Sequence, residues 1–378
     1  MSVDEMERMA RLTCASAVDS RLYAGDADGR VHCFDACVVG ASVDRAQQRR
    51  WTARAAFDAI TSICVVRKAD EKVVIAAGTT TGAVIIFRDH VQERRLQVDS
   101  AVVSITAAAG DGEFLVGDLH GSLYGVNLYE VVWKTRLPAS TSSSTPFITT
   151  SQTPCVRAMQ SVCMLDVEKT ASSYVLIAAG QNELLVTHRG RTFGSIPTPS
   201  PVSAILCVRS ASPDLEMEEA NPMDGKKTHK GKQAPVEDLV LVGGLDGIVS
   251  HVFPVREPAD NHTAFRFAVE PWARVSFPVA KLVSVRTDLQ SGGLDDVKWL
   301  CLGVNGELAY FFGKKQVREW SSVQGRVGAQ DDHDRVPFDL LVLPGSTTKG
   351  PVVAIITGQS IKRVPLDEEV VEAMDMTS

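Results

Sequence analysis

A unit made of a strand, a glycine, a tight turn and a second strand returns seven times along the chain and constrains its fold more than any other feature. Each unit joins two short apolar or β-branched runs, as in residues 73–78 followed by 83–87. The glycines of the seven units are Gly25, Gly78, Gly117, Gly180, Gly243, Gly303 and Gly358. Their spacings of 39 to 63 residues fit one propeller blade per unit, because a blade of four strands needs about 40–45 residues.

The residues between the two runs are those that tight hairpin turns require. Such turns place one or two residues at positive φ, which Gly and Asn tolerate best. The turn pairs are Asp28-Gly29, Thr81-Gly82, His120-Gly121, Asp246-Gly247 and Asn305-Gly306, with Gln181-Asn182 and Gln359-Ser360 in the fourth and seventh units. The pattern therefore predicts a series of antiparallel hairpins.

Further apolar runs flank the units and complete a blade of four strands. Runs before the units, at residues 59–66, 101–106, 201–208, 279–285 and 338–343, are expected to form innermost strands. Runs after four units carry Trp51, Trp133, Trp272 and Trp320, which we expect on outermost strands, covering the seams between blades. We predict an all-β fold, a single closed seven-bladed β-propeller of WD40- or quinoprotein-like architecture spanning residues 1–378.

Three stretches depart from the repeat and are expected to be flexible insertions. They cover residues 140–153, 210–237 and 324–335. The second contains a basic run at 226–232 that superficially resembles a nuclear-import patch, but we favour its interpretation as a solvated loop. The acidic residues 367–374 are read as a short helix or as the outer strand that completes the last blade.

The net charge and the distribution of apolar residues limit the classes of partner and the cellular compartment that we expect. The net charge of −7 disfavours a general nucleic-acid role, which usually needs a basic face. No apolar run reaches the roughly 18 residues that span a bilayer, and the N-terminus lacks the features of a secretory signal. Eight cysteines without a CxxC pair are expected to be buried free thiols. We expect a cytoplasmic protein that reaches any organelle surface through partners.

One loop resembles a Ca²⁺-binding loop but is short of ligands. Such loops place side-chain oxygens at alternating positions, and here Asp288, Gln290 and Asp296 occupy three of them. Gly292 stands where another oxygen is needed, so we interpret the loop as degenerate and assign no metal ligand. The acidic residues 331–334 with their histidine are interpreted as a solvated loop.

Motifs that carry catalysis or bind cofactors are missing from the sequence. It contains no nucleophile elbow, HExxH, phosphate-binding loop or dinucleotide fingerprint, and its eight histidines are scattered. We therefore expect no enzymatic activity, no catalytic residues and no cofactor.

Two segments resemble known propeller repeats. Residues 277–320 are similar to an FG-GAP-type repeat, with an Asp-containing loop, Leu-Asp-Asp, a strand ending in Gly, a hairpin and a Trp. Residues 236–247 repeat its hairpin, and 121–134 resemble a quinoprotein-type blade, whose cofactor ligands have no match here. WD-repeat character is limited to Phe34-Asp35, which approximates Trp-Asp. The FG-GAP resemblance implies a propeller subunit of the kind found in the KICSTOR scaffold, which tethers nutrient-signalling complexes.

Three functions follow from these expectations. The first is a non-catalytic protein-interaction scaffold, a subunit of a nutrient-signalling complex or, alternatively, of a ciliary or vesicle-trafficking complex, with other proteins as partners. The second is a ligand-binding or catalytic propeller that uses its central channel. That function predicts converging acidic, His or Arg side chains at the starts of the inner strands, where the sequence has Asp58, Asp99 and Pro201. A nuclear role through residues 226–232 is the third.

Overall fold

The structure is a computed structural model, and it describes most of the chain outside several loops and both ends. The described residues are 11–35, 49–68, 72–108, 113–138, 155–165, 171–180, 182–188, 190–208, 238–259, 262–285, 297–320, 336–343, 351–359 and 361–366. The three expected insertions, the loop with Asp288, Gln290 and Asp296, and residues 367–378 lie outside them.

The described residues form antiparallel sheets of consecutive strands. The first sheet contains β1 (Leu12–Val18), β2 (Arg21–Asp26), β3 (Arg30–Asp35) and β4 (Arg49–Arg54). The second contains β5 (Ile60–Arg67), β6 (Val73–Thr79), β7 (Ala83–Arg88) and β8 (Val91–Gln97). The third contains β9 (Val102–Ala107), β10 (Phe114–Asp118), β11 (Ser122–Val126) and β12 (Val131–Arg136).

The remaining sheets continue the same order. The fourth contains β13 (Ala158–Leu165), β14 (Ala171–Ala178), β15 (Glu183–His188) and β16 (Arg191–Pro197). The fifth contains β17 (Val202–Val208), β18 (Leu239–Gly244), β19 (Ile248–Ala259) and β20 (His262–Arg274). The sixth contains β21 (Val279–Ser284), β22 (Lys298–Gly303), β23 (Leu308–Phe312) and β24 (Lys315–Trp320). The last contains β25 (Pro337–Leu343), β26 (Val352–Thr357) and β27 (Ile361–Pro365).

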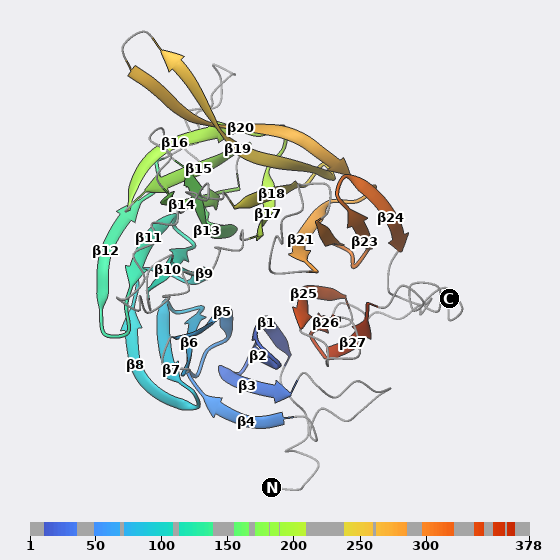
Figure 1. Ribbon diagram of the computed structural model, residues 1–378. Coiled ribbons are helices and arrows are strands. Elements are labelled where there is room, and N and C mark those ends of the chain that lie inside the picture. The colour runs from blue at the N-terminus through green and yellow to red at the C-terminus, as the bar shows by residue number, and fades with distance from the viewer. Residues whose placement is uncertain are drawn as a thin grey trace, which may run out of the picture.

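The sheets are arranged radially around a central axis, as the blades of a propeller (Figure 1). The first strand of each sheet is innermost and contacts the first strand of the next sheet, and β25 contacts β1. The all-β propeller prediction is confirmed. The predicted count of seven four-stranded blades is wrong: six blades have four strands, and β25–β27 form an incomplete three-stranded sheet. A fourth strand would have to hydrogen-bond along β27, and no described segment does so.

The two ends of the described chain meet where the first and last sheets pack together. Leu12, Leu22 and Phe34 of the first sheet share one apolar cluster with Val352 and Ile356 of the last. The backbone N–H of Leu12 also donates to the carbonyl of Gly358 at 2.9 Å. Side-chain packing therefore joins the last sheet to the first, without a described strand that belongs to both.

The strand glycines are required by close approach between blades. A Cβ on Gly25 would lie 2.5 Å from Ile60 Cγ2, and one on Gly78 would lie 2.3 Å from Val102 Cγ1. In both cases the contact comes from the innermost strand of the next blade. The absence of a Cβ at these positions therefore lets neighbouring blades pack backbone to side chain.

The positions of the predicted glycines are only partly equivalent. Gly25, Gly78, Gly117 and Gly243 each pair with the residue six positions later across their hairpin. In the fourth and sixth sheets Ala178 and Leu302 hold that place instead, and Gly180 and Gly303 follow it. The turn glycines do have the predicted positive φ: Gly29, Gly82, Gly121, Gly247 and Gly306 lie between 75° and 87°.

Replacing Gly78 by alanine should destabilise the protein by about 2 kcal/mol, because inserting a methyl group into a packed core costs about 1–3 kcal/mol. The matched control is Gly194→Ala in β16, where an added Cβ meets nothing within 4 Å. That control should be neutral or slightly stabilising, since Gly in a strand costs about 0.5–1 kcal/mol relative to Ala. Urea unfolding of both variants measures the difference, and equal effects would contradict the close-approach explanation.

The four tryptophans lie where the sequence predicted them, on outermost strands and at seams. Trp51 packs against the cluster shared by the first and second sheets, and Trp133 against the cluster of the third and fourth. Trp272 belongs to the cluster of the fifth and sixth sheets, and Trp320 packs against that of the sixth and last. The seam prediction is confirmed at all four positions.

Candidate interaction surfaces

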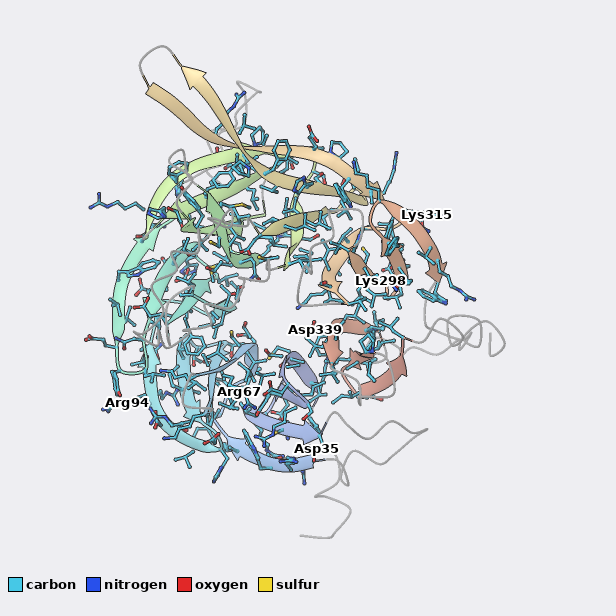
Figure 2. All side chains as sticks on the ribbon, viewed as in Figure 1. Asp35, Arg67, Arg94, Lys298, Lys315 and Asp339 are labelled. Carbon is cyan, nitrogen blue, oxygen red and sulfur yellow. The ribbon has the colours of Figure 1, made fainter. Side chains whose placement is uncertain are left out.

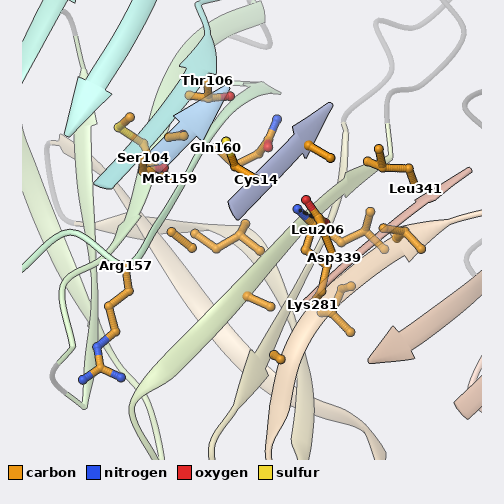
Figure 3. A pocket seen from close by; sticks show the side chains of 18 of the residues that line it. Cys14, Ser104, Thr106, Arg157, Met159, Gln160, Leu206, Lys281, Asp339 and Leu341 are labelled. Carbon is orange, nitrogen blue, oxygen red and sulfur yellow. Dashed lines mark ion pairs between the residues drawn. The ribbon is translucent and has the colours of Figure 1, made fainter. Parts of the chain in front are cut away.

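A central cavity of about 660 Å³ is lined by the innermost strands of every sheet (Figure 3). Most of its lining consists of hydroxyl-bearing and apolar side chains, and its charged residues are Arg157, Lys281 and Asp339. Lys281 Nζ lies 2.9 Å from Asp339 Oδ1. This pair neutralises two of the three charges, so the channel is a weakly charged passage.

Three of the channel hydroxyls hold neighbouring blades together. Thr13, Thr61 and Ser203 occupy the same place at the start of their innermost strands. The Thr61 hydroxyl lies 3.2 Å from the carbonyl oxygen of Gly78 in its own blade and 2.5 Å from that of Val102 in the next. Thr13 and Ser203 make the corresponding contacts. These hydroxyls therefore connect neighbouring blades and are not positioned to bind a ligand.

The side chains proposed to converge on the channel do not do so. Asp58 accepts hydrogen bonds from the backbone N–H and the hydroxyl of Thr81, at 3.0 and 2.8 Å. Asp99 forms an ion pair with Lys134. Neither they nor Pro201 line the channel. The observed geometry gives the ligand-binding hypothesis no cluster of polar side chains at the expected positions.

A buried carboxylate and histidine form a polar network inside the first blade. Asp26 Oδ2 lies 2.8 Å from His32 Nε2, and His32 Nδ1 lies 2.9 Å from Thr52 Oγ1. Asp26 and His32 are 0% and 1% exposed. The other carboxylate oxygen accepts from the backbone N–H groups of Asp28 and Arg30. The network ties the hairpin turn to the outermost strand, where Thr52 is exposed, while Asp26 and His32 are buried.

The environment of Asp26 favours its charged form. Burial acts to raise the pKa of the carboxyl, but the hydrogen bond with His32 and those from the two backbone N–H groups outweigh it, and the pKa is lowered. The third blade has a related arrangement, in which Tyr124 donates to Asp118 Oδ2 at 3.0 Å. No sequence motif predicted the partners of His32.

A second cavity, of about 520 Å³, lies on the outer rim between the fourth and fifth blades. It is lined by Val186, Phe193, Gly194, Ser195, Ile196, Pro197, Arg266, Phe267, Ala268 and Val269. Next to it, β19 and β20 pair over twelve residues and project beyond the ring (Figure 1). We call this cavity the rim groove.

Exposed aromatic side chains occur at separate places on the surface. Phe57 is 88% exposed and lies under the guanidinium of Arg54, and Tyr129 and Phe312 are also exposed. Phe193, 47% exposed, differs from them because it lines a cavity. All side chains with described placement are drawn in Figure 2, where Arg94 and Lys315 point outward from the rim.

The described cysteines are free, as predicted, but only Cys33 and Cys301 are fully buried. Burial raises the pKa of Cys14 and of Cys64 to about 12, which makes both poor nucleophiles.

Within the described ranges, no group of three or more potential ligand residues could hold a metal ion, and no helix is long and apolar enough to cross a membrane.

Comparison with known proteins supports the fold alone. No model of a protein family and no curated protein matches the sequence, so nothing here supports the FG-GAP or KICSTOR resemblance. The chain is similar to BBS1N in two crystal structures of its complex with ARL6DN. The structure soaked with mercury has a TM-score of 0.58 at 13% identity and covers 95% of this chain and 93% of that chain. The structure soaked with lead has a TM-score of 0.58 at 12% identity, covering 96% and 94%.

A second solved neighbour has the same architecture. The β-propeller domain of Cps50 (Swd1) from Myceliophteria thermophila has a TM-score of 0.57 at 12% identity, covering 95% of this chain and 98% of that chain. These likenesses extend over nearly the full length of each chain. The chain described here shares its β-propeller fold with these neighbours.

Proposed function

We propose that this chain is a non-catalytic scaffold, the propeller subunit of a multiprotein complex. The observation that carries the proposal is the rim groove, where a half-exposed aromatic side chain lines a cavity beside a projecting hairpin. Exposed apolar surface of this kind is typical of protein interaction sites. A neighbour of similar extent, BBS1N, was solved in complex with another protein, ARL6DN, which supports the proposal.

The described polar groups favour binding over catalysis. In the channel, the hydroxyls of Thr13, Thr61 and Ser203 contact backbone carbonyls, and Lys281 is paired with Asp339. The buried Asp26 and His32 are closed off from solvent. A catalytic site needs groups that reach a substrate, so we infer that the protein is not an enzyme and requires no cofactor.

The identity of the partner proteins decides which complex contains this subunit. A nutrient-signalling complex of the KICSTOR kind follows from the sequence resemblance, and a ciliary or vesicle-trafficking complex is the alternative. Both place the protein in the cytoplasm, with other proteins as partners and no nucleic acid.

Affinity purification from cells that express the tagged full chain at its natural level tests the proposal. We expect the chain to elute in size-exclusion chromatography with stoichiometric protein partners, whose identities then decide between the two assemblies. A free monomer without a stoichiometric partner would overturn the scaffold proposal. A parallel screen of small metabolites by thermal shift, with Lys281→Met as the channel variant, would support the channel hypothesis if a ligand stabilises only the wild type.

A further inference from the structure

The outermost strands of the first three blades carry an excess of basic side chains. Together β4, β8 and β12 contain seven basic residues and one acidic residue, although the whole chain has 39 basic and 46 acidic residues. All seven basic side chains are exposed. This patch, which we call the basic rim, consists of Arg49, Arg50, Arg54, Arg94, Arg95, Lys134 and Arg136.

Most of the positive charge of the basic rim is not neutralised by the described part of the chain. Arg50 is paired with Asp35 at 2.7 Å, and Lys134 is paired with Asp99. The single acidic residue, Glu93, is already paired with Arg88 of β7 at 3.1 Å. The side chains that form no ion pair with described residues are all arginines, namely Arg49, Arg54, Arg94, Arg95 and Arg136.

Three of the basic side chains flank the seam between the second and third blades. Arg94 lies opposite Ile86. Lys134 lies opposite Tyr124, and Arg136 is two residues further along the same strand. Opposite residues of antiparallel strands share a face, and Ile86 and Tyr124 both belong to the apolar cluster between these two blades. The three cations therefore border one seam, where Arg94 points outward from the rim (Figure 2).

The shape and the composition of the basic rim favour a protein segment as its occupant. The three strands follow the curved outer wall of the ring (Figure 1), so a flat bilayer could touch only part of the patch at once. Val91 of β8 and Val132 of β12 are 56% and 50% exposed, and a phosphate backbone offers no apolar group to cover them. An extended polypeptide with acidic and apolar side chains can follow the curve and cover both kinds of surface.

We propose that the basic rim binds an acidic, extended segment of a partner protein. Asp and Glu side chains of the segment pair with the unpaired arginines, because a guanidinium can donate two parallel hydrogen bonds to one carboxylate. Exposed ion pairs contribute little one by one, so affinity comes from several pairs together and falls as salt is added. The inference rests on the proposed scaffold function and adds a surface separate from the rim groove.

A fluorescein-labelled peptide of alternating Glu and Thr with a central Leu, titrated into the purified full chain, tests the proposal. Alternation places the carboxylates on one face of an extended chain. The double variant Arg94→Glu with Arg136→Glu should weaken binding by at least about tenfold, because two attractive pairs become repulsive. The same peptide with Gln in place of Glu should bind neither protein.

The matched control is the double variant Arg274→Glu with Lys315→Glu. It makes the same change in net charge, at exposed positions on the outermost strands of the fifth and sixth blades. Its affinity should stay within about twofold of the wild type, because charges more than a Debye length away are screened. Equal losses in the two double variants would overturn the proposal, as would equal binding of the Glu and Gln peptides. Tighter binding of phosphatidylserine vesicles or of a single-stranded oligonucleotide at the same arginines would also overturn it.

Affinity purification of the same variants from cells separates this proposal from the scaffold function. The Arg94→Glu and Arg136→Glu double variant should lose a stoichiometric partner that the wild type and the control variant keep. If it keeps every partner, the scaffold function stands and the assignment of the basic rim fails. If the wild type has no partner, the scaffold function fails, while the peptide titration still decides whether the basic rim binds acidic segments.

Discussion

Trp299→Ala is expected to lower the free energy of unfolding by about 4 kcal/mol, since truncating a buried Trp or Phe to Ala costs about 3–5 kcal/mol. Trp299 is fully buried and stacks on Phe311 with ring centroids 4.0 Å apart and planes 7° apart. Its Nε1 donates to the carbonyl of Gly313 at 2.9 Å. Alanine would remove the stacked ring and leave a cavity in the cluster shared by the fifth and sixth sheets.

Denaturant unfolding of two companion variants separates the ring from its hydrogen bond. Trp299→Phe keeps an aromatic ring and should cost about 1–2 kcal/mol, near the usual net value of a hydrogen bond plus some lost volume. The Gly313 carbonyl would keep a donor, because Trp272 Nε1 also reaches it, at 3.3 Å. Phe57→Ala on the surface should change stability by less than about 0.5 kcal/mol. A Trp299→Ala effect as small as that of Phe57→Ala would contradict the packing described here.

Asp26→Ala is expected to destabilise the protein by about 3 kcal/mol at neutral pH, because each buried group left without its hydrogen-bond partner costs about 1–3 kcal/mol. It leaves His32 Nε2 without its carboxylate and the backbone N–H groups of Asp28 and Arg30 without an acceptor. The matched control is Asp246→Ala. Asp246 is an exposed turn residue that accepts from the N–H of Ile248, and its loss should cost about 1 kcal/mol or less.

The stabilising effect of Asp26 is also expected to depend on pH, and the sign of that dependence follows from its pKa. The folded-state pKa of Asp26 is lowered, so its contribution is present above the unfolded-state value of about 3.9 and is lost as pH falls through the folded value. The stability difference between wild type and Asp26→Ala should therefore be constant from neutral pH down to about pH 5 and shrink below about pH 4. Urea unfolding at a series of pH values checks this. A difference that grows on acidification would show that the carboxylate is not the stabilising form.

The sequence predicted what is local and missed what is long-range. The turn glycines, the hairpins and the seam tryptophans follow from short patterns of chain geometry and burial. The equivalence of Gly180 and Gly303 with Gly25 was wrong by one or two residues, because Ala178 and Leu302 occupy the strand position in those two sheets and the glycines follow it.

The candidate site could not be predicted from the sequence, because it also depends on long-range contacts. The rim groove brings Phe193 and Phe267 together from strands far apart in the chain, and no short pattern encodes that meeting. The Asp26–His32 hydrogen bond links residues close in sequence, yet it depends on both being buried, which the surrounding blades decide. The length of the β19–β20 hairpin could not be predicted from the sequence either. Its two strands stay paired over more residues than the spacing of turns in the other units indicates.

The way in which the first and last sheets meet has a consequence for biosynthesis. A ribosome releases Leu12 and Phe34 more than 300 residues before Val352 and Ile356, so the first blade is made long before the surface that covers it. During that interval its apolar flank is open to water and to other nascent chains, the situation in which aggregation and chaperone capture occur. Contacts so distant in sequence also slow folding. A chain cut short before β26 should therefore be retained by chaperones, although its earlier blades have all their strands.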